Sequence, residues 1–402
     1  MFNTHYLTPT TILLALLIAT AKSDSSTHKL DSIYISGTTP YEVGKALGEY
    51  EREGLQRLFS ADPLLVDVLR PWKATHEAEY NTFVAINLAR FPRYFEEIRG
   101  IADGAGVSEA DLILTALGPE IETLQNLDTG GNCFDAIGHP QSGGGGPIVG
   151  HNEDLGPIYK EYSFLATIHQ PYVEAGSART ITSFVYPGAP LGFTFGWNSA
   201  GVMVSCNGIF PRPNPAGLAR YFVNRYVLEA TSVEDALARL ESVKKELALG
   251  FATTVSQART TRVVNVEMGP NVMSVVEVRK GSSLIHCNMY SHDDTVNVFN
   301  NFAQTSTNRL ARAQELNEPM TPRDVINILG DTMDPVFPIY RNGKKPDFLS
   351  TAASVIFDIE KARVEIYGGN PKFTRPTAVF NFDKMEDDAE ERKGVCGTDG
   401  VC

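Results

Sequence analysis

The sequence predicts an α+β sandwich in which β-sheets are covered by helices on their outer faces. Two observations carry this prediction. Helical patterns fill residues 40–120, whereas short β-rich segments separated by Gly and Pro dominate from Cys133 onward. Helices therefore come in separate blocks and do not alternate one by one with strands, as a parallel βαβ winding requires.

The first block is mostly helical. A short β-branched strand at Ile33 to Ser36 precedes a helix expected over Pro40 to Leu58, which starts at a proline. Further helices are expected at Glu77 to Ala89, Arg93 to Ala105 and Ser108 to Leu117, because apolar residues recur there at helical spacing. The last of them opens with Ser-x-x-Asp, a form of capping box.

The second block contains most of the strands, with helices inserted as pairs. Strands are expected at residues 148–151, 164–169, 179–186, 193–197, 201–206, 261–268, 272–279, 283–288, 352–358 and 363–367. Helices are expected at residues 219–230, 232–248, 307–316 and 321–331.

The charge balance limits the partners of the chain. Its 402 residues contain 35 Lys+Arg against 48 Asp+Glu, a net charge of −13, and no basic cluster stands out. A negatively charged protein repels nucleic acid and anionic membranes, so neither is an expected partner. A small neutral or cationic substrate fits this composition better.

Both ends of the chain are expected to lie outside the catalytic fold. Residues 1–23 hold an apolar run, Thr11 to Thr20, and then a small-x-small cleavage pattern, which is typical of a signal peptide. The run is too short to span a bilayer, so we expect a secreted or vesicular protein that starts near Asp24, without membrane insertion. Residues 383–402 form an acidic tail that we expect to be disordered.

Five cysteines are an odd number for a secreted chain. If Cys396 and Cys402 pair across their short loop, then Cys133, Cys206 and Cys287 remain, and at least one of them keeps a free thiol. A free thiol in an oxidising compartment calls for a reason, such as chemistry.

The segment around Cys133 offers that chemistry. It is expected to form a strand, a Gly-rich turn centred near Ser142 to Gly144, and a second strand that returns Asp154 beside Cys133. Gly130 and Gly131 allow the strained backbone in which the thiol attacks the preceding carbonyl.

Cleavage between Asn132 and Cys133 would make Cys133 the first residue of a new chain. Its α-amine, with a pKa of about 7.7 to 8.0, could then act as the base for its own thiol. The carboxylate of Asp154 would hold and orient that ammonium or thiol. The alternative is an inert buried thiol followed by a loose surface turn.

Six short motifs occur in one order along residues 33–380. They are P-Y-x-x-G-x-x-x-G at 40–48, G-P-x-x-G-x-N-x-D at 146–154, G-x-N-x-x-G at 196–201, V-E at 266–267, H-C-N-M-Y at 286–290 and I-Y-R at 339–341. In this the chain resembles the isopenicillin-N acyltransferase and β-alanyl-amine (carcinine) hydrolase family of N-terminal nucleophile hydrolases. More distantly it resembles penicillin V acylase, bile-salt hydrolase and acid ceramidase.

The resemblance implies a four-layer αββα sandwich that needs no cofactor. It also implies self-cleavage into a mainly helical α chain, residues 24–132, and a β chain, residues 133–382, which carries the catalytic sandwich. Cys133 is then the nucleophile, Asp154 its orienting acid, Asn288 an amide donor to the transition state, and Arg341 a cation near the nucleophile. The chain departs from the family where Asn132 and Phe134 flank the cysteine and where Cys287 and Met289 flank Asn288.

The residue types support these roles separately, each with an alternative. Asn288 ends an apolar strand and offers two N–H donors to an oxyanion, or it caps a turn. Arg341 follows a Pro-rich turn, where it could lower the thiol pKa or bind a substrate carboxylate, or remain a solvated surface residue.

Substrate contacts are expected from Phe134, Trp197 and Asn198. The two aromatic side chains suit an apolar group, and Asn198 either lines the pocket or belongs to a turn. Four histidines, His139, His151, His286 and His292, lack the close spacing of metal ligands. We therefore expect no metal site and interpret them as surface or core residues.

These observations favour an enzyme that hydrolyses a small non-protein amide through an acyl-cysteine intermediate. A β-alanyl amine, an N-acyl amino acid or a penicillin-like compound would be such a substrate. One alternative is an acyltransferase that tailors a peptide-like product of secondary metabolism. Another is a secreted binding protein that kept the fold without catalysis.

Overall fold

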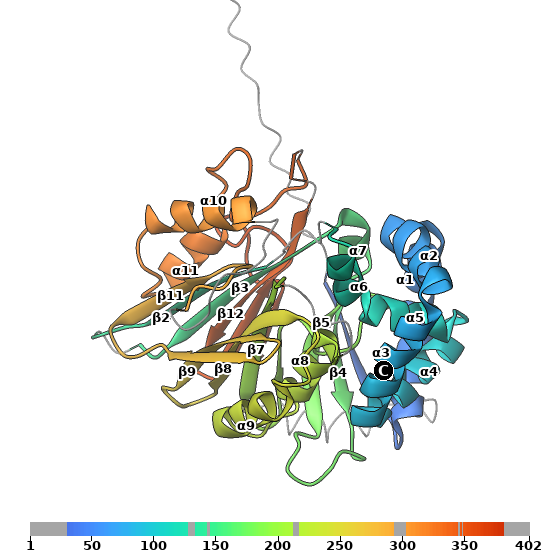
Figure 1. The fold of residues 1–402 in the computed structure, drawn as a ribbon. Helices are drawn as coiled ribbons and strands as arrows, with labels where there is room; N and C mark the ends of the chain where they lie inside the picture. Colours follow the sequence, from blue (N-terminus) through green and yellow to red (C-terminus); the bar gives the residue numbers. More distant parts are fainter. Residues whose placement is uncertain are drawn as a thin grey trace, which may run out of the picture.

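The computed structural model describes residues 30–127, 133–142, 145–211, 217–292 and 303–381, except 345 and 348 (Figure 1). The signal peptide expected at 1–23, the residue Asn132 and the tail expected at 383–402 lie outside the described residues, as do Cys396 and Cys402. Within these ranges no helix combines the length and the apolar character needed to cross a bilayer.

Two sheets form the centre of the described structure. One has the strand order β1 (Asp31–Ser36), β4 (Phe164–His169), β5 (Thr180–Val185), β6 (Gly196–Asn198), β7 (Val202–Ile209), β8 (Gly250–Gln257), β9 (Val263–Gly269) and β10 (Val272–Glu277). The other has the order β11 (Ser282–His286), β2 (Cys133–His139), β3 (Ile148–Leu155), β12 (Ser350–Asp358), β13 (Arg363–Tyr367) and β14 (Ala378–Asn381). Strand β1 pairs with β4 in parallel, whereas β2, β3 and β12 pair antiparallel.

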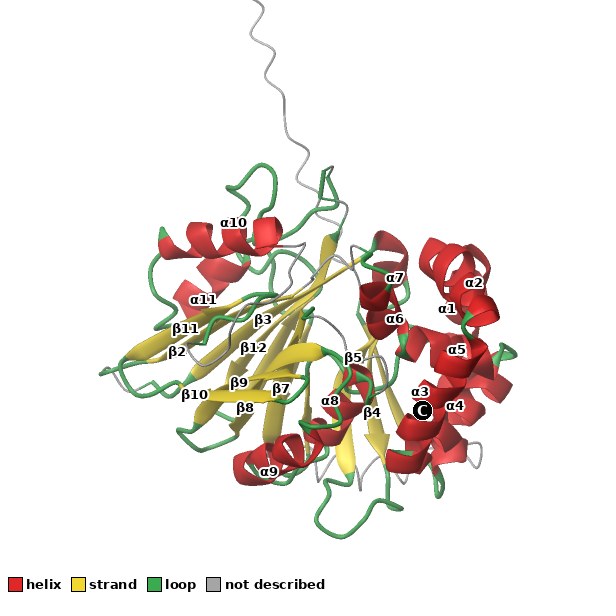
Figure 2. Cartoon of the chain, viewed as in Figure 1, coloured by secondary structure: helices red, strands yellow, loops and turns green. Residues whose placement is uncertain are grey.

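Helices cover the outer face of each sheet (Figure 2). The six-stranded sheet carries α10 (Ala303–Gln314) and α11 (Pro322–Leu329), and α7 (Pro157–Glu161) follows β3. The eight-stranded sheet carries the larger set, which is α1 (Pro40–Ala61), the π-helix η1 (Leu64–Leu69), α2 (Arg70–Thr75), α3 (Glu77–Arg90), α4 (Pro92–Ala105), α5 (Glu109–Ala116), α6 (Gly118–Leu124), α8 (Arg220–Leu228) and α9 (Val233–Val243).

Three apolar cores fill the spaces between the layers. One lies between the larger helix set and the eight-stranded sheet, with Leu47 and Val255 among its members. A second lies between the two sheets and contains Trp197 and Phe357. The third lies between the six-stranded sheet and α10 and α11. The order of layers is thus helix, sheet, sheet, helix, which confirms the predicted four-layer αββα sandwich.

The glycines of the first motif serve helix packing. A Cβ on Gly44 would lie 2.0 Å from a backbone oxygen of α4, and a Cβ on Gly104 would lie 2.2 Å from a backbone oxygen of α1. Any larger residue at these positions would push the two helices apart. The spacing Gly44-x-x-x-Gly48 therefore fixes the contact of α1 with α4 and has no direct part in the chemistry.

The helix expected at 232–248 is shorter than predicted. It ends at Val243, and the segment after it pairs with Leu218, whose backbone N–H donates to Glu246 and whose carbonyl accepts from Ala248. Strand β8 follows and was not predicted. Seven of its eight residues are buried, so it lacks the alternation of apolar and polar residues that marks a half-exposed strand.

Candidate active site

The hairpin of β2 and β3 positions the candidate nucleophile. Cys133 pairs with Glu153, and Asp135 pairs with His151. Because side chains alternate along a strand, these four residues share one face of the hairpin. The pairing of the two strands was predicted, while residues 143–144 of the predicted turn lie outside the described residues. The residue directly opposite Cys133 is Glu153, one position before Asp154.

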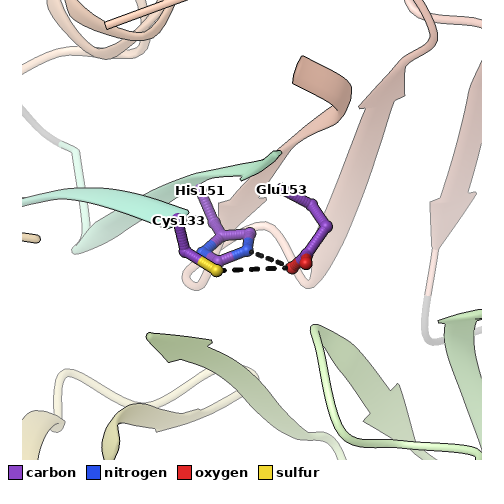
Figure 3. Close-up of side chains that lie close together, drawn as sticks. All are labelled: Cys133, His151 and Glu153. Carbon is purple, nitrogen blue, oxygen red and sulfur yellow. Dashed lines mark hydrogen bonds and ion pairs between the residues drawn. The ribbon is translucent and has the colours of Figure 1, made fainter. Parts of the chain in front are cut away.

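The four side chains form a continuous buried chain of hydrogen bonds. Figure 3 shows three of them, Cys133, His151 and Glu153. His151 Nδ1 lies 2.6 Å from Asp135 Oδ1, and His151 Nε2 lies 3.1 Å from Glu153 Oε2. The Cys133 thiol donates to the same Glu153 Oε2 over 3.7 Å. One carboxylate oxygen is therefore in contact with both the thiol and the imidazole.

The second oxygen of Asp135 anchors this chain to the opposite sheet. Ser205 on β7 and Thr254 on β8 each donate a hydroxyl hydrogen bond to Asp135 Oδ2 over 2.8 Å. Burial alone would raise the pKa of Asp135, but His151 and the two hydroxyls lower it below its ordinary value. Asp135 is thus a charged acceptor that fixes the orientation of the His151 ring.

The surroundings determine which groups hold protons. Burial alone would lower the pKa of His151, but the charge of Asp135 and the hydrogen bonds of the imidazole with Asp135, Cys133 and Glu153 raise it well above its ordinary value. Burial, followed by the charge of Glu153, raises the pKa of Cys133 to about 12. Burial also raises the pKa of Glu153, against the opposing effect of His151. At neutral pH the resting site therefore holds a neutral thiol beside an imidazolium.

Asn288 and Arg309 contact the backbone of the candidate nucleophile. The Cys133 N–H donates to Asn288 Oδ1 over 3.3 Å, and Asn288 Nδ2 donates to the carbonyl of Gly208 over 3.1 Å. Arg309 on α10 donates to the Cys133 carbonyl and to Asn288 Oδ1, each over 2.9 Å. The structure thus places Asn288 beside Cys133, while its part in the reaction stays a prediction.

Asp154 and Arg341 lie on the other side of the hairpin strand. Thr351 donates to Asp154 Oδ1 over 2.6 Å, and Oδ2 lies 3.7 Å from Arg309 and 3.9 Å from Arg341. Arg341 is itself held by Asp347 through two hydrogen bonds, of 2.7 and 2.5 Å. Burial raises the pKa of Asp154 to about 6, against the opposing charges of both arginines.

No hydrogen bond between Asp154 and Cys133 is present in the described residues. The link between them runs through Arg309, which contacts the Cys133 carbonyl and lies near Asp154 Oδ2. That oxygen is buried and accepts no hydrogen bond in the described structure. A buried acceptor of this kind suits a cation that is not yet formed, such as an α-ammonium group.

Cys133 opens onto a cavity of about 520 Å³. The thiol, Glu153 and Asp154 line it together with aromatic side chains from several elements, namely Tyr159, Tyr186, Phe193, Phe210 and Tyr221. A cavity of this size accepts a small molecule and leaves an apolar group in contact with aromatic walls.

The three predicted substrate contacts do not line this cavity. Phe134 is fully buried in the core under α10 and α11, on the opposite face of β2 from the thiol. Trp197 is buried between the sheets, where it packs on Phe357 and Phe380. The structure therefore places both rings in apolar cores, since an aromatic residue in a strand faces the core as readily as a pocket.

Asn198 is a turn residue. Its Nδ2 donates to the carbonyls of Leu228 and Ala230, each over 2.7 Å, and its Oδ1 accepts from Ala200 and Val202. Both ends of the amide are therefore occupied, so the turn interpretation of this residue is the one that the structure supports.

Comparison with known proteins assigns the chain to a protein family. A family model described as acyl-coenzyme A:6-aminopenicillanic acid acyl-transferase matches residues 141–373, more than half of the chain. The chain belongs to this family. The resemblance inferred from the six motifs is thereby confirmed.

Two curated relatives span nearly the whole chain. Beta-alanyl-dopamine/carcinine hydrolase of Drosophila melanogaster is 26% identical over 86% of this chain and 94% of its own length. The 40 kDa form of acyl-coenzyme A:6-aminopenicillanic-acid-acyltransferase of Emericella nidulans is 23% identical over 87% and 95%. Both are enzymes that act on amides, one a hydrolase and one an acyltransferase.

A solved structure was also found. It is a mutant of conjugated bile acid hydrolase from Clostridium perfringens, with a TM-score of 0.40 and 10% identity over 63% of this chain and 93% of that chain.

Four residues of the site were missed by the sequence interpretation. His151 was taken for a surface or core residue, and Asp135, Glu153 and Arg309 were not singled out. The signal for the first three was present, since a hairpin that closes at Cys133 also brings Asp135 beside His151 on the same face. Arg309 had no such signal, because its helix reaches Cys133 from a distant part of the sequence.

The same donors could in principle hold a metal ion. The ligand atoms of Cys133, His151 and Glu153 lie within 4.8 Å of one another, and this set suits zinc. However, Glu153 Oε2 already accepts from the thiol and contacts the imidazole. The hydrogen bonds among the three groups occupy their donor and acceptor atoms without a cation, so the reaction proposed below uses no metal ion.

Proposed function

We propose that this family member is a cysteine amidohydrolase that cleaves a small non-protein amide through an acyl-Cys133 thioester. One observation carries the proposal. A thiol in the wall of a 520 Å³ cavity is hydrogen-bonded to a buried carboxylate, which is in turn positioned by an imidazole and a second carboxylate. This arrangement joins a nucleophile to a proton acceptor with a third group that orients it.

The proposed reaction begins with proton transfer. Because the thiol pKa is about 12, the thiolate forms only as the proton moves to Glu153 Oε2. The thiolate adds to the substrate carbonyl, and the same proton passes to the leaving nitrogen as the amide C–N bond breaks. Water then enters, Glu153 accepts its proton, and the hydroxide releases the acid and restores the thiol.

Asn288 is placed to stabilise the tetrahedral intermediate. Its Nδ2 carries two hydrogens and donates to the carbonyl of Gly208. In the reaction this amide group is proposed to donate also to the developing oxyanion. Removing one such donor costs about 2.7 to 4 kcal/mol of transition-state stabilisation in other enzymes.

Self-cleavage before Cys133 is part of the proposal. The new α-ammonium group would carry more hydrogens to donate than the peptide N–H of the uncut chain. Two buried oxygen atoms could accept them. Asn288 Oδ1 already accepts from the Cys133 nitrogen, and Asp154 Oδ2 lacks a hydrogen-bond donor. The α-amine could then share the role of base with Glu153.

Acyl transfer is the second candidate function. The same thioester can be taken by an amine, and the relative from Emericella nidulans is named as an acyltransferase. Hydrolysis is preferred because residues 1–23 predict entry into the secretory pathway, where acyl-coenzyme A has no obvious supply. A non-catalytic binding protein would leave the thiol and its hydrogen-bonded chain without a purpose.

The test uses the full chain, produced with and without Cys133→Ala. Intact mass and N-terminal sequencing should show two fragments in the wild type, the larger beginning at Cys133, and an uncut variant. The wild type should hydrolyse members of a panel of β-alanyl amines, N-acyl amino acids, penicillins and N-acyl lipids, whereas the variant should lose about 10⁴-fold or more in turnover.

Cys206→Ala is the matched control. Cys206 also lines the cavity and is buried, but its thiol contacts Thr253 and does not touch the Glu153 carboxylate. Turnover should stay within about threefold of the wild type. Loss of hydrolysis in both folded variants to the same extent would reject Cys133 as the nucleophile.

A further inference from the structure

The cavity holds one basic side chain among its described lining residues, Arg220. It is the first residue of α8, and its backbone N–H donates to Glu120 Oε1 over 2.8 Å, which fixes its position. The guanidinium carbon lies 4.8 Å from the ring centre of Tyr221 and 5.8 Å from that of Phe210. Two aromatic rings of the cavity wall thus hold the cation.

Arg220 forms no ion pair within the described chain, although the charge of the nearby Glu120 carboxylate acts on it. Its Nε is buried and donates no hydrogen bond, and its guanidinium lies over two aromatic rings. The buried arginines Arg309 and Arg341 differ, since Arg309 donates to two oxygens and Arg341 is paired with Asp347. A guanidinium N–H that is buried without an acceptor is unfavourable unless a ligand supplies one.

Four acidic residues of the described chain line the cavity, and three of them, Asp62, Glu153 and Asp154, are engaged elsewhere, the fourth being Glu122. Asp62 accepts from the Tyr159 hydroxyl and from the Leu64 N–H. Glu153 belongs to the hydrogen-bonded chain at the thiol, and Asp154 accepts from Thr351. None of these three lies within ion-pair distance of Arg220 in the described structure.

Gly208 connects Arg220 to the reaction centre. Its carbonyl accepts the hydrogen bond of Asn288 Nδ2, and a Cβ on this glycine would lie 3.2 Å from Arg220 Nη1. The guanidinium therefore lies against the residue that also holds the proposed oxyanion donor. A group bound by Arg220 would be part of the same small molecule whose carbonyl faces Cys133.

We propose that Arg220 binds a carboxylate of the substrate, so that the enzyme acts on amides that carry a carboxylate near the scissile bond. A planar guanidinium held between rings presents its N–H edge, which matches the two oxygens of a carboxylate. This inference rests on the proposed function and narrows its substrate class. N-acyl amino acids place the carboxylate on the amine side, and monoamides of dicarboxylic acids place it on the acyl side.

The test compares each acid with its neutral carboxamide. The probes are N-phenylacetylglycine and N-phenylacetylglycinamide for the amine side, and the monoanilide of glutaric acid and its carboxamide for the acyl side. For the pair that fits, the wild type should favour the acid by about 10- to 100-fold in kcat/KM, mainly through KM, as expected of charge-assisted hydrogen bonds.

Arg220→Gln should abolish this preference, so that the loss of kcat/KM is at least about tenfold larger for the acid than for the carboxamide. Arg220→Lys, which keeps the charge but loses the planar edge, should give an intermediate preference. Arg57→Gln is the matched control, because Arg57 is an exposed arginine that stacks on Tyr162, a residue outside the catalytic cavity. Thermal unfolding of each variant checks that the fold is retained.

Calorimetry with the Cys133→Ala chain separates this inference from the proposed function. If no amide is hydrolysed but this chain binds the acid more tightly than the carboxamide, and Arg220→Gln removes the difference, the carboxylate site stands alone. If amides are hydrolysed at equal kcat/KM for acid and carboxamide in both pairs, the carboxylate site is rejected and the amidohydrolase stands. An equal loss on both members of a pair in Arg220→Gln also rejects it.

Discussion

The two faces of the β2–β3 hairpin are built from alternate residues of the same strands, yet they differ in kind. The face toward the second sheet carries Cys133, Asp135, His151 and Glu153, all titratable and hydrogen-bonded to one another. The face toward α10 and α11 carries Phe134 and Asn152. A shift of one residue in register would exchange the two sets.

The polar group on the outer face has a structural use. Asn152 donates to the carbonyls of Leu329 and Ile339 and accepts from the Ser354 hydroxyl over 2.6 Å, so it ties the hairpin to α11 and β12. On the inner face, by contrast, one carboxylate oxygen is shared by a thiol and an imidazole beside a cavity. Burial alone therefore does not distinguish catalytic from structural polar residues. The two faces differ in that each polar atom of Asn152 has its own backbone or hydroxyl partner, whereas one oxygen of Glu153 is shared by two titratable groups.

Among the variants that test the difference between the two faces, Glu153→Gln should have the largest effect on turnover. The amide keeps the shape but cannot accept the thiol proton, so turnover should fall by about 10²- to 10⁴-fold. Because burial raises the pKa of Glu153, wild-type activity should fall with decreasing pH from a point above its ordinary value of 4.5, and this acid limb should vanish in the variant. A pH profile of kcat/KM for both proteins measures it, and an unchanged acid limb would exclude Glu153 as the acceptor.

His151→Gln should reduce turnover by about 10- to 100-fold and change the pH dependence of stability. The pKa of His151 is raised in the folded chain, so its contribution is complete below the unfolded value of about 6.5 and is lost as pH rises through the folded value. The melting temperature of the wild type relative to the variant should therefore decline as pH rises above 6.5. A constant difference from pH 6 to pH 9 would contradict the protonated imidazole.

Asp154→Asn tests the boundary between the two faces. If its unpartnered Oδ2 receives the α-ammonium of Cys133, self-cleavage and turnover should each slow by about tenfold or more, which equals at least 1.4 kcal/mol. Cleavage half-time and turnover on an accepted amide are the measurements. Values within about twofold of the wild type would assign Asp154 to the structural face, with Thr351 and the two arginines.

Trp197→Phe should have the smallest effect on catalysis. Trp197 is buried between the sheets against Phe357 and Phe380, so the smaller ring should lower stability by about 1 to 3 kcal/mol while KM and kcat stay unchanged. Denaturant unfolding and steady-state kinetics check both. A selective rise in KM would return Trp197 to the substrate pocket.

Much of the fold was predictable because it follows local periodicity. The hairpin at Cys133 was indicated by the glycines between its two strands. The long helix beginning at Pro40 was indicated by its proline start and by the helical spacing of its apolar residues. Strand β8 was missed since it is buried on both faces, and η1 because a single π-helical segment has no sequence period of its own.

The site was predictable mainly along the hairpin, with Asn288 as the further residue that the sequence indicated and the structure places beside Cys133. Cys133 and its returning strand could be found from sequence, and the two-residue period could have extended this to Asp135 and His151. Arg309 and Arg220 enter from helices far away in the chain, so their positions depend on tertiary packing. Phe134 and Trp197 were expected in the pocket and lie in apolar cores, because sequence does not tell which face of a buried strand meets a cavity.

The pairing of β1 with β4 has a consequence for a chain cut before Cys133. Strand β1 would belong to the shorter fragment, yet it pairs with β4 of the longer one over six residues and shares its apolar core. Asn87 of the shorter fragment also exchanges buried hydrogen bonds with Gly217 and Ala219. Separation of the fragments would expose this core, so dissociation and unfolding would be one event, and the melting temperature of the cut protein would rise with its concentration.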